Sequence, residues 1–307
     1  MAEKSWLDDL STEEVDVQAV DAFHHGGTLF SASFELSDAY SEFARSYVLE
    51  IDFSETITYT IRLQIEDTIR SHTSPSASEH HALELGGIVH HLTPAGDTTA
   101  NLPNGVLKKI WKHTGSRLFA IGELGVSYVR ERGLWTQLAT VVGATMNDIH
   151  GNDTRPVYVA GNLGLLLQLE GAGWTPIDLG VHDQFNAVSV ADSGSVFLGG
   201  ADGAAFEFVE SELIALDSET VDYFGICEFK GRRYWSDANF GLSIQNGNRI
   251  EPLRRLGQGF TMSATADYLV IVGWHEFFVF DGKDWTGFEL GYDGGIFMRR
   301  IDIADYG

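Results

Sequence analysis

The stretch Tyr158-Val-Ala-Gly161-Asn-Leu-Gly164-Leu-Leu-Leu-Gln-Leu169, with Trp174 shortly after it, decides the fold. It contains a hydrophobic run, a Gly-x-x-Gly turn, a second hydrophobic run and a tryptophan ten residues after the second glycine. Short hydrophobic runs separated by glycine turns are typical of β-strands. The stretch therefore predicts a β-hairpin followed by a strand that begins near Trp174.

The same pattern returns about every 38 residues, which predicts a β-propeller with one blade per repeat. A second copy leads from Phe119 to Trp135, and a third leads from Phe197 to Leu213. Weaker copies lie upstream and downstream of these and stay in phase. The position of the second glycine recurs at Gly87, Gly125, Gly164, Gly203, Gly241 and Glu276.

The first 80 residues must supply the rest of the ring. Residues 28–34, 46–53 and 56–65 are rich in Thr, Val, Ile and Tyr, which predicts three strands. These strands make up most of one further blade. The sequence therefore predicts an all-β propeller of seven four-stranded blades, with six blades as the alternative.

We expect one propeller domain over residues 1–307. Residues 1–80 would form an irregular first blade, residues 81–294 the regular repeats and residues 295–307 a closing strand. The polar stretch Ser71–Glu79 is expected to be a loop between blades. Pairing of the strand in residues 295–303 with the blade begun by the N-terminus would close the ring and leave no exposed edge.

Each regular repeat divides into four strands. In the repeat around Gly161 these are Met146–His150, Val157–Ala160, Leu165–Leu169 and Trp174–Leu179. The first strand would line the axis and the last would lie outermost. Gly-x-x-Gly is then the tight turn between the second and third strands, where a positive φ favours glycine.

The repeat resembles those of the photosystem assembly factor and BNR-like propeller families. Gly-Leu-Trp135, Gly-Ala-Gly-Trp174 and Asp-Gly-Lys-Asp-Trp285 are similar to the Asp/Gly…Trp signature of their outer strands. The resemblance covers about residues 82–291 and implies a propeller fold. The full Ser-x-Asp-x-Gly-x-Thr-Trp box is missing, which argues against a sialidase, and no Gly-His…Trp-Asp pairing of WD repeats occurs.

Charge restricts the partners. The chain has 20 basic and 44 acidic residues, a formal net charge of −24. Such a protein repels phosphate backbones and anionic lipids, so we expect neither nucleic acid nor a membrane as partner, and long-range attraction favours cationic proteins. The first nine residues lack the basic and apolar regions of a secretory signal, and we expect a cytoplasmic protein.

Strand alternation places the turns between second and third strands on the same face as the loops that enter the first strands. This face mixes acids, amides and aromatics, a composition that predicts a binding surface for a basic partner. Alternatively, its leucines pack the turns and its phenylalanines point into the blades. The turn residues are Glu123, Leu124, Asn162, Leu163, Ala201, Asp202, Asn239, Phe240, Trp274 and His275, and the loops add His182, Asp183, Phe185, Asp222, Tyr223, Phe224, Gln258 and Phe260.

Histidines occur in three adjacent pairs, at residues 24–25, 80–81 and 90–91, with Glu79 and Glu84 nearby. Imidazoles and carboxylates suit zinc, but adjacent residues of a strand point to opposite faces. We therefore expect no metal site. Phosphate-loop, dinucleotide and nucleophile-elbow motifs are also missing from the sequence, and we expect no cofactor.

Two further features bear on catalysis. Cys227 is the single cysteine and lies in an apolar run, so it is expected to be a packed thiol. Asp148, Asp183, Asp202 and Asp237 could supply a carboxylate pair for hydrolysis, but only at a defined separation.

These observations favour a non-enzymatic binding protein. In its sharpest form, it is an acidic cytoplasmic inhibitor of the immunity-protein kind, which covers a basic toxin or effector domain. The alternatives are a general assembly scaffold, a carboxylate-dependent glycoside hydrolase or lyase working at the axial funnel, and a lectin.

Overall fold

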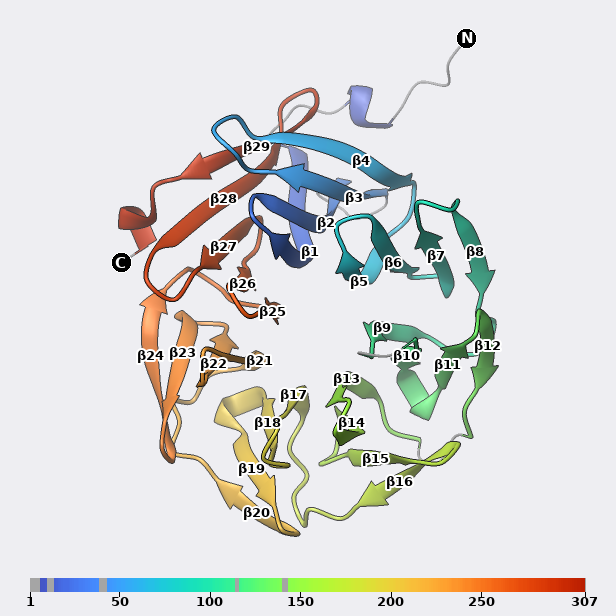
Figure 1. The fold of residues 1–307 in the computed structure, drawn as a ribbon, viewed down its shortest axis with the longest axis vertical. Coiled ribbons are helices and arrows are strands. Elements are labelled where there is room, and N and C mark those ends of the chain that lie inside the picture. The colour runs from blue at the N-terminus through green and yellow to red at the C-terminus, as the bar shows by residue number, and fades with distance from the viewer. Residues whose placement is uncertain (1–5, 10–13, 39–42, 114–115, 140–142, 307) are drawn as a thin grey trace.

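A computed structural model describes residues 6–9, 14–38, 43–113, 116–139 and 143–306. These residues form seven antiparallel sheets, each with its strands in sequence order, arranged as a ring (Figure 1). The predicted seven-bladed propeller is therefore confirmed. Within the described ranges, no helix has the length and apolar character needed to cross a membrane.

Blades are numbered in chain order, and the first strand of each lies at the axis (Figure 1). Blade 1 contains β1 (Val15–Gly26), β2 (Leu29–Asp38), β3 (Ala44–Asp52) and β4 (Thr58–Ile65). Blade 2 contains β5 (Ile69–Ser76), β6 (Glu79–Glu84), β7 (Ile88–Leu92) and β8 (Thr98–Asn101). Blade 3 contains β9 (Leu107–Lys112), β10 (Leu118–Gly122), β11 (Ser127–Glu131) and β12 (Leu134–Gln137). Blade 4 contains β13 (Met146–Asn152), β14 (Arg155–Gly161), β15 (Leu166–Glu170) and β16 (Gly173–Ile177).

The remaining blades complete the ring. Blade 5 contains β17 (Phe185–Val190), β18 (Val196–Gly200), β19 (Ala205–Val209) and β20 (Glu212–Ala215). Blade 6 contains β21 (Tyr223–Phe229), β22 (Arg232–Asp237), β23 (Gly241–Asn246) and β24 (Arg249–Arg255). Blade 7 contains β25 (Met262–Ala264), β26 (Leu269–Val272), β27 (Glu276–Phe280), β28 (Trp285–Tyr292) and β29 (Ile296–Ile301). Short 3-10 turns are η1 (Trp6–Asp9), η3 (Glu123–Gly125), η4 (Ala201–Gly203) and η5 (Ile303–Tyr306).

The hydrophobic core lies between neighbouring blades. Phe119 of blade 3, for example, belongs to the same buried cluster as Val159 and Leu167 of blade 4. The repeated tryptophan begins the outermost strand, as predicted, and reaches back into this interface. Trp174 is 4% exposed, and its indole N–H donates to Ser127 Oγ of blade 3 at 2.9 Å. The tryptophan of the repeat thus fixes the packing of blade 4 on blade 3.

Side chains also join the blades around the axis, where the inner edge of each first strand has no neighbouring strand. Asp148 Oδ2 of blade 4 accepts the Val188 N–H of blade 5 at 2.9 Å. Ser263 Oγ of blade 7 donates to the Ala22 carbonyl of blade 1 at 2.7 Å. Such bonds satisfy backbone groups that would otherwise be unpaired in a buried place.

Two expectations for the N-terminal quarter are wrong. Residues 15–65 form a complete and regular blade, so residues 1–80 are not one irregular blade. The stretch Ser71–Glu79 is not an inter-blade loop, because residues 71–76 belong to β5 and only Ala77 and Ser78 turn into β6. Ser71, Thr73 and Ser74 are buried at the axis, and this location explains a polar strand that resembles a loop in sequence.

The expected closure by pairing of the termini is also wrong. β29 pairs with β28 as a fifth strand of its own blade, over Gly287–Tyr292 and Ile296–Ile301. β29 lies beside β4 at the outside of the ring (Figure 1). Tyr59 OH donates to the Ile296 carbonyl at 2.8 Å, so side chains join the last blade to the first.

Candidate binding rim

Hydrogen bonds tie the turns of the predicted face to the loops that enter the first strands. The N–H groups of Glu123 and Asn162 donate to the carbonyls of Val106 and Thr145, in the loops that enter β9 and β13, at 2.8 and 3.0 Å. The second glycine bonds forward to the next blade, as Gly164 N–H donates to the Asp183 carbonyl at 2.8 Å. We call this face, made of the second-to-third-strand turns and the entering loops, the turn rim.

The two glycines of Gly-x-x-Gly have different roles. The second has a positive φ, as predicted, with Gly164 at 71°. The first is extended, with Gly122 at φ −169°, so the predicted reason for glycine is wrong at that position. A Cβ on Gly161 would lie 2.0 Å from the Thr145 carbonyl oxygen. The first glycine is therefore required by the close approach of the entering loop.

The residue before the second glycine carries an unusual backbone for its type. Leu124, Leu163 and Asp202 have φ of 53°, 62° and 55°. The left-handed region suits Gly, Asn and Asp, and a leucine there is strained by roughly 1 kcal/mol. Leu124 and Leu163 are nevertheless 67% and 71% exposed. The alternative that these leucines pack the turns is therefore wrong.

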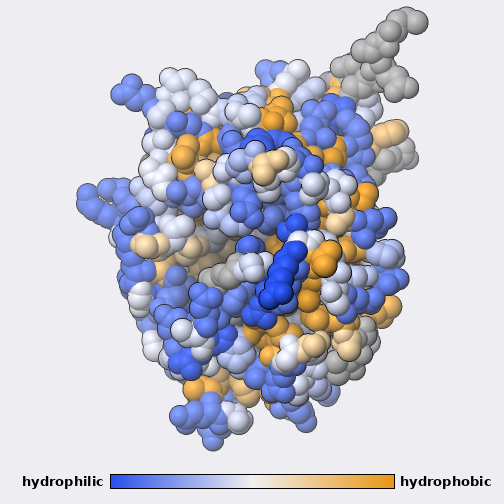
Figure 2. Space-filling model, turned by 45° about the vertical axis from the view of Figure 1, so that its right-hand side comes forward, coloured by the Kyte–Doolittle hydropathy of each residue, from blue (hydrophilic) through white to orange (hydrophobic). Residues whose placement is uncertain are grey.

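Acidic side chains lie on the turn rim from blade 3 to the loop that enters blade 6, and Glu123 is next to Leu124 in sequence. Glu123, Asp183, Asp202 and Asp222 form no ion pair within the described part of the chain. On the opposite rim many acids are paired, such as Glu131 with Arg117, Asp97 with Arg62 and Asp284 with Lys283. Uncompensated negative charge thus lies on the turn rim, and the opposite rim also has exposed acids without an ion pair in the described ranges, such as Glu55, Glu210 and Asp267. Figure 2 shows a mostly hydrophilic surface with hydrophobic groups in scattered patches.

Several predicted rim residues lie close to one another. The Asp202 N–H donates to Asp222 Oδ1 at 2.9 Å, which joins blade 5 to the loop that enters blade 6. Asn162 Oδ1 accepts from Asn147 at 2.8 Å. Trp274 is 40% exposed, and its indole N–H donates to Asp16 Oδ1 at 3.4 Å. These side chains are held in place before any partner binds.

Other predicted members do not offer surface to a partner. Tyr223 is 1% exposed and packs on Trp235, with 5.4 Å between the ring centroids. Phe185 is fully buried, which fits the alternative that it points into its blade. Phe240 is half-buried, with Arg255 5.6 Å above its ring, whereas Asn239 beside it is exposed. The half-buried His275 bonds to Glu276, its Nε2 lying 3.4 Å from Oε1.

Sequence reasoning missed three exposed apolar residues on the turn rim. Phe43, Leu85 and Val106 are 52%, 40% and 41% exposed, respectively. Leu85 lies in the turn of blade 2, where Leu-Gly-Gly87 departs from the regular spacing. The recurrence of leucine next to a turn glycine, at Leu85, Leu124 and Leu163, was the signal that could have identified it.

The carboxylates considered for hydrolysis have separate structural partners. Asp237 replaces the first glycine in blade 6 and is fully buried; its Oδ1 accepts from the Phe240 N–H at 2.6 Å and its Oδ2 from Ser243 Oγ at 2.8 Å. Asp148 lies at the axis, with Lys109 Nζ 3.7 Å from its Oδ1. Asp237 and Asp148 are thus held by separate structural partners, so they do not face each other as a carboxylate pair for hydrolysis.

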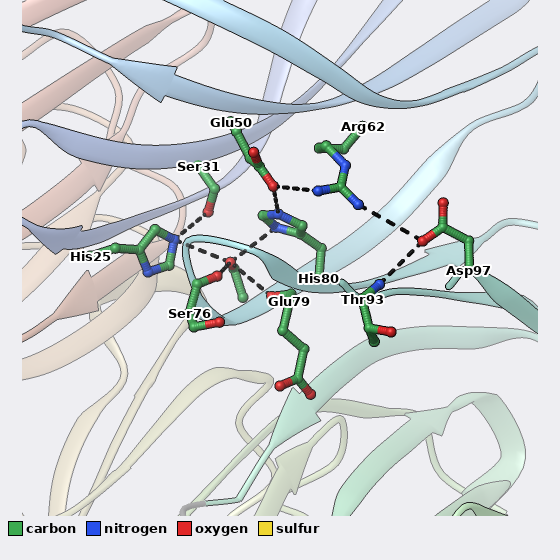
Figure 3. Close-up of polar contacts among 10 residues, drawn as sticks. His25, Ser31, Glu50, Arg62, Ser76, Glu79, His80, Thr93 and Asp97 are labelled. Carbon is green, nitrogen blue, oxygen red and sulfur yellow. Dashed lines mark hydrogen bonds and ion pairs between the residues drawn. The ribbon is translucent and has the colours of Figure 1, made fainter. Parts of the chain in front are cut away.

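His25 and His80, one from each of two histidine pairs, belong to a hydrogen-bond network in blades 1 and 2 (Figure 3). Ser74 Oγ lies 3.0 Å from His80 Nδ1 and 3.1 Å from His25 Nε2, and His80 Nε2 lies 3.2 Å from Glu50 Oε1. Arg62 Nη1 bonds to the same oxygen at 2.7 Å. Within the described ranges, no three potential ligands come together as a metal site.

A second chain of bonds fixes the neutral form of His81 and His91. Trp135 Nε1–H donates to His91 Nε2 at 3.4 Å, so a neutral His91 carries its proton on Nδ1. Nδ1 of His91 lies 2.9 Å from His81 Nδ1, and His81 Nε2 lies 3.0 Å from Glu79 Oε1. Burial lowers the pKa of both histidines to about 3, and the charges of Lys112 and Arg130 add to this.

Acid is therefore expected to destabilise the protein through blade 2. Unfolded histidines titrate near 6.5, whereas burial keeps the pKa of His81 and His91 near 3 and that of His25 near 4. Between these values only the unfolded chain binds the protons, so stability is full above about pH 6.5 and falls as the pH drops. We expect a loss of about 2 kcal/mol per histidine between pH 7 and 5. Urea unfolding at several pH values in this range measures the free energy of unfolding. His91→Gln should reduce the slope of that free energy against pH by an amount that corresponds to nearly one proton. An unchanged slope would contradict this account.

No family model matches the chain. The immune protein Tsi7 of Pseudomonas aeruginosa is 27% identical over 147 residues, which cover 45% of this chain and 47% of that protein. The chain thus spans about half the length of this curated relative.

Solved structures agree with the fold. YCF48 bound to D1 peptide has a TM-score of 0.61 at 12% identity, covering 85% of this chain and 90% of that one. The WD40 propeller domain of Doa1 has a TM-score of 0.65 at 10% identity, covering 84% and 94%. The resemblance to propeller repeat proteins that the Gly-x-x-Gly…Trp pattern implies is therefore confirmed for the fold.

Proposed function

We propose that this chain is a non-enzymatic inhibitor of the immunity type, which binds a basic toxin or effector domain in the cytoplasm through the turn rim. The observation that carries this proposal is the pair Leu124 and Leu163. Each leucine combines a left-handed backbone with more than two-thirds exposure, at the same position of adjacent blades. Strain and exposure of this kind persist at sites where function requires them.

Both the leucines and the acids of the rim suit one type of partner. Burying a leucine side chain contributes about 1.5–3 kcal/mol, which supports two apolar anchors at the centre of an interface. Glu123, Asp183, Asp202 and Asp222 lie on the same rim, form no ion pair among the described residues, and would attract a cationic surface over long range. Bonds such as that from Glu123 to Val106 hold the rim rigid, which lowers the entropic cost of association.

The similarity to Tsi7 supports the inhibitor form of this proposal over a general scaffold, because that relative is named an immune protein. The match is partial, so the role of the whole chain is part of the proposal. A toxin domain that acts on nucleic acid or another anionic substrate has a cationic cleft. An acidic rim would occlude such a cleft directly, without a chemical step.

Co-expression tests the proposed function. A toxin-like open reading frame beside the gene for this chain would be expressed in a sensitive host, alone and together with the chain. We expect growth to be restored by the wild-type protein and by the opposite-rim variant Glu170→Gln, but not by Leu124→Asn/Leu163→Asn. Rescue by all three proteins would remove the turn rim from the mechanism. Failure of the wild-type protein to rescue growth or to bind the gene product would reject the inhibitor role.

A further inference from the structure

The axis contains a cavity that is separate from the turn rim. Its volume is about 630 Å³, which lies in the range of small-molecule sites. Its lining starts midway along the first strands, at Asp21, Lys109 and Asp148. It continues toward the ends of these strands that lead to the opposite rim, where His150 and Glu228 line it. The cavity therefore extends away from the proposed docking face.

Negative charge exceeds positive charge in the inner part of this cavity. Lys109 Nζ lies 3.7 Å from Asp148 Oδ1, and the two side chains are 26% and 17% exposed. Asp21 is 5% exposed and forms no ion pair within the described part of the chain. Its Oδ2 accepts from the His72 N–H at 2.8 Å and lies 3.4 Å from Ser71 Oγ. One ammonium thus faces two carboxylates.

Charges nearer the mouth are of both signs. Glu228 lines the mouth and bonds to Arg233, with Nη2 3.2 Å from Oε2. Lys112 also lines the cavity and acts electrostatically on His81 and on His113, which is a further lining residue. The excess of carboxylates is therefore confined to the inner part of the cavity, beside Asp21. Burial raises the pKa of Asp21, as expected of a carboxylate with too little cationic compensation.

The side chain of one buried histidine in the wall lacks a hydrogen-bond partner in the described part of the chain. His72 is 1% exposed and lines the cavity, and both of its ring nitrogens are unpaired among the described residues. A neutral imidazole offers one donor and one acceptor, and leaving both unpaired in a buried place is destabilising. Aromatic rings complete the lining. Phe23 packs edge-on against His72 at 5.4 Å between ring centroids, and Trp111 and Phe224 lie on other strands of the wall.

We propose that this cavity binds a small organic cation, with its ammonium or guanidinium group beside Asp21 and its apolar part against Trp111, Phe23 and Phe224. The cation would balance the second carboxylate, and its N–H groups would also reach the acceptor nitrogen of His72. Aromatic faces attract such a cation when it is desolvated. Apart from Phe224, which is also one of the entering-loop residues, this site does not use the turn rim, and the proposal does not depend on the inhibitor role.

Methyl NMR tests this proposal on the full chain. Met262 lines the cavity, whereas Met298 lies in β29 at the outside of the ring. Benzylammonium is the probe, benzyl alcohol is its neutral match and sodium chloride controls ionic strength. We expect the Met262 methyl resonance to shift saturably with benzylammonium below about 10 mM, while Met298 stays unchanged. No shift, or an equal shift with benzyl alcohol, would overturn the proposal.

A charge-neutralising variant tests whether Asp21 is the recognition group. Asp21→Asn keeps an oxygen that accepts the His72 N–H but removes the charge, and it should weaken benzylammonium binding on the order of tenfold. Asp267→Asn, a matched change in the exposed turn between β25 and β26, should leave binding unchanged. Equal affinities of the wild-type protein and Asp21→Asn would overturn the assignment.

Cys227 provides a second readout on the unmodified protein, should Asp21→Asn fail to fold. It is the one cysteine of the chain, it lines the cavity, and burial raises the pKa of its thiol to about 12. Alkylation by iodoacetamide at about pH 8, where benzylammonium keeps its proton and the thiol reacts slowly through its small thiolate fraction, should slow several-fold with saturating benzylammonium but not with benzyl alcohol. An alkylation rate that is unaffected by benzylammonium would contradict occupancy of the cavity.

Discussion

Replacing Leu124 and Leu163 with asparagine is expected to weaken binding of the basic partner by about two orders of magnitude without destabilising the free protein. Each leucine would lose an apolar anchor worth about 1.5 kcal/mol or more. Asparagine tolerates the left-handed backbone found at φ 53° and 62° far better than leucine does. Stability should therefore stay level or rise while affinity falls.

This prediction is specific because partner affinity should fall while the stability of the free protein stays level or rises. Partner affinity would be measured by calorimetry, and stability by thermal unfolding of the free protein. Leu134 provides a matched control, because it is 74% exposed but lies on the opposite rim, at the start of β12. Leu134→Asn should leave affinity unchanged. A loss of stability with unchanged affinity for Leu124→Asn/Leu163→Asn would mean that the leucines serve the fold.

Gly161→Ala is expected to destabilise the protein by more than about 3 kcal/mol. Its Cβ would lie 2.0 Å from the Thr145 carbonyl oxygen, which also accepts the Asn162 N–H at 3.0 Å. The backbone of the turn or of the entering loop must move, and that bond would be lost. The effect is steric, since Gly161 does not have a positive φ.

Urea unfolding measures this effect, with Gly173→Ala as the control in the same blade. A Cβ on Gly173 meets no atom within 4 Å, and the residue begins β16. Its replacement should change stability by less than about 1 kcal/mol. If Gly161→Ala were as mild as Gly173→Ala, the close approach would not explain the first glycine of the repeat.

The regular blades could be predicted because their signals are local. The strands expected around Gly161 match β13 to β16 within two residues at most ends, and Trp174 begins an outermost strand. Turn glycines and hydrophobic runs are constraints within a single repeat, so one sequence suffices to identify them. The shared face of the turns followed from strand alternation alone.

Other features depend on contacts between distant segments and could not be predicted in the same way. β5 resembles a loop because its Ser71, Thr73 and Ser74 are buried in the polar axis. β29 pairs with its own blade because Gly287 and Gly291 leave room for the side chains of Ile301 and Phe297. Tyr223 could not be separated from exposed rim residues, because its burial arises from packing on Trp235.

Salt dependence of partner binding tests the central claim most directly. The rim variant Glu123→Gln/Asp183→Asn/Asp202→Asn/Asp222→Asn removes four negative charges, and the control variant Glu55→Gln/Glu170→Gln/Glu210→Gln/Asp267→Asn removes four from exposed residues of the opposite rim. Affinity for the basic partner would be measured from about 50 to 500 mM salt. We predict that wild-type protein and control lose affinity steeply with salt, whereas the rim variant binds more weakly at low salt and shows a much shallower slope. Equal slopes for the rim variant and the control would contradict the acidic turn rim as the docking face.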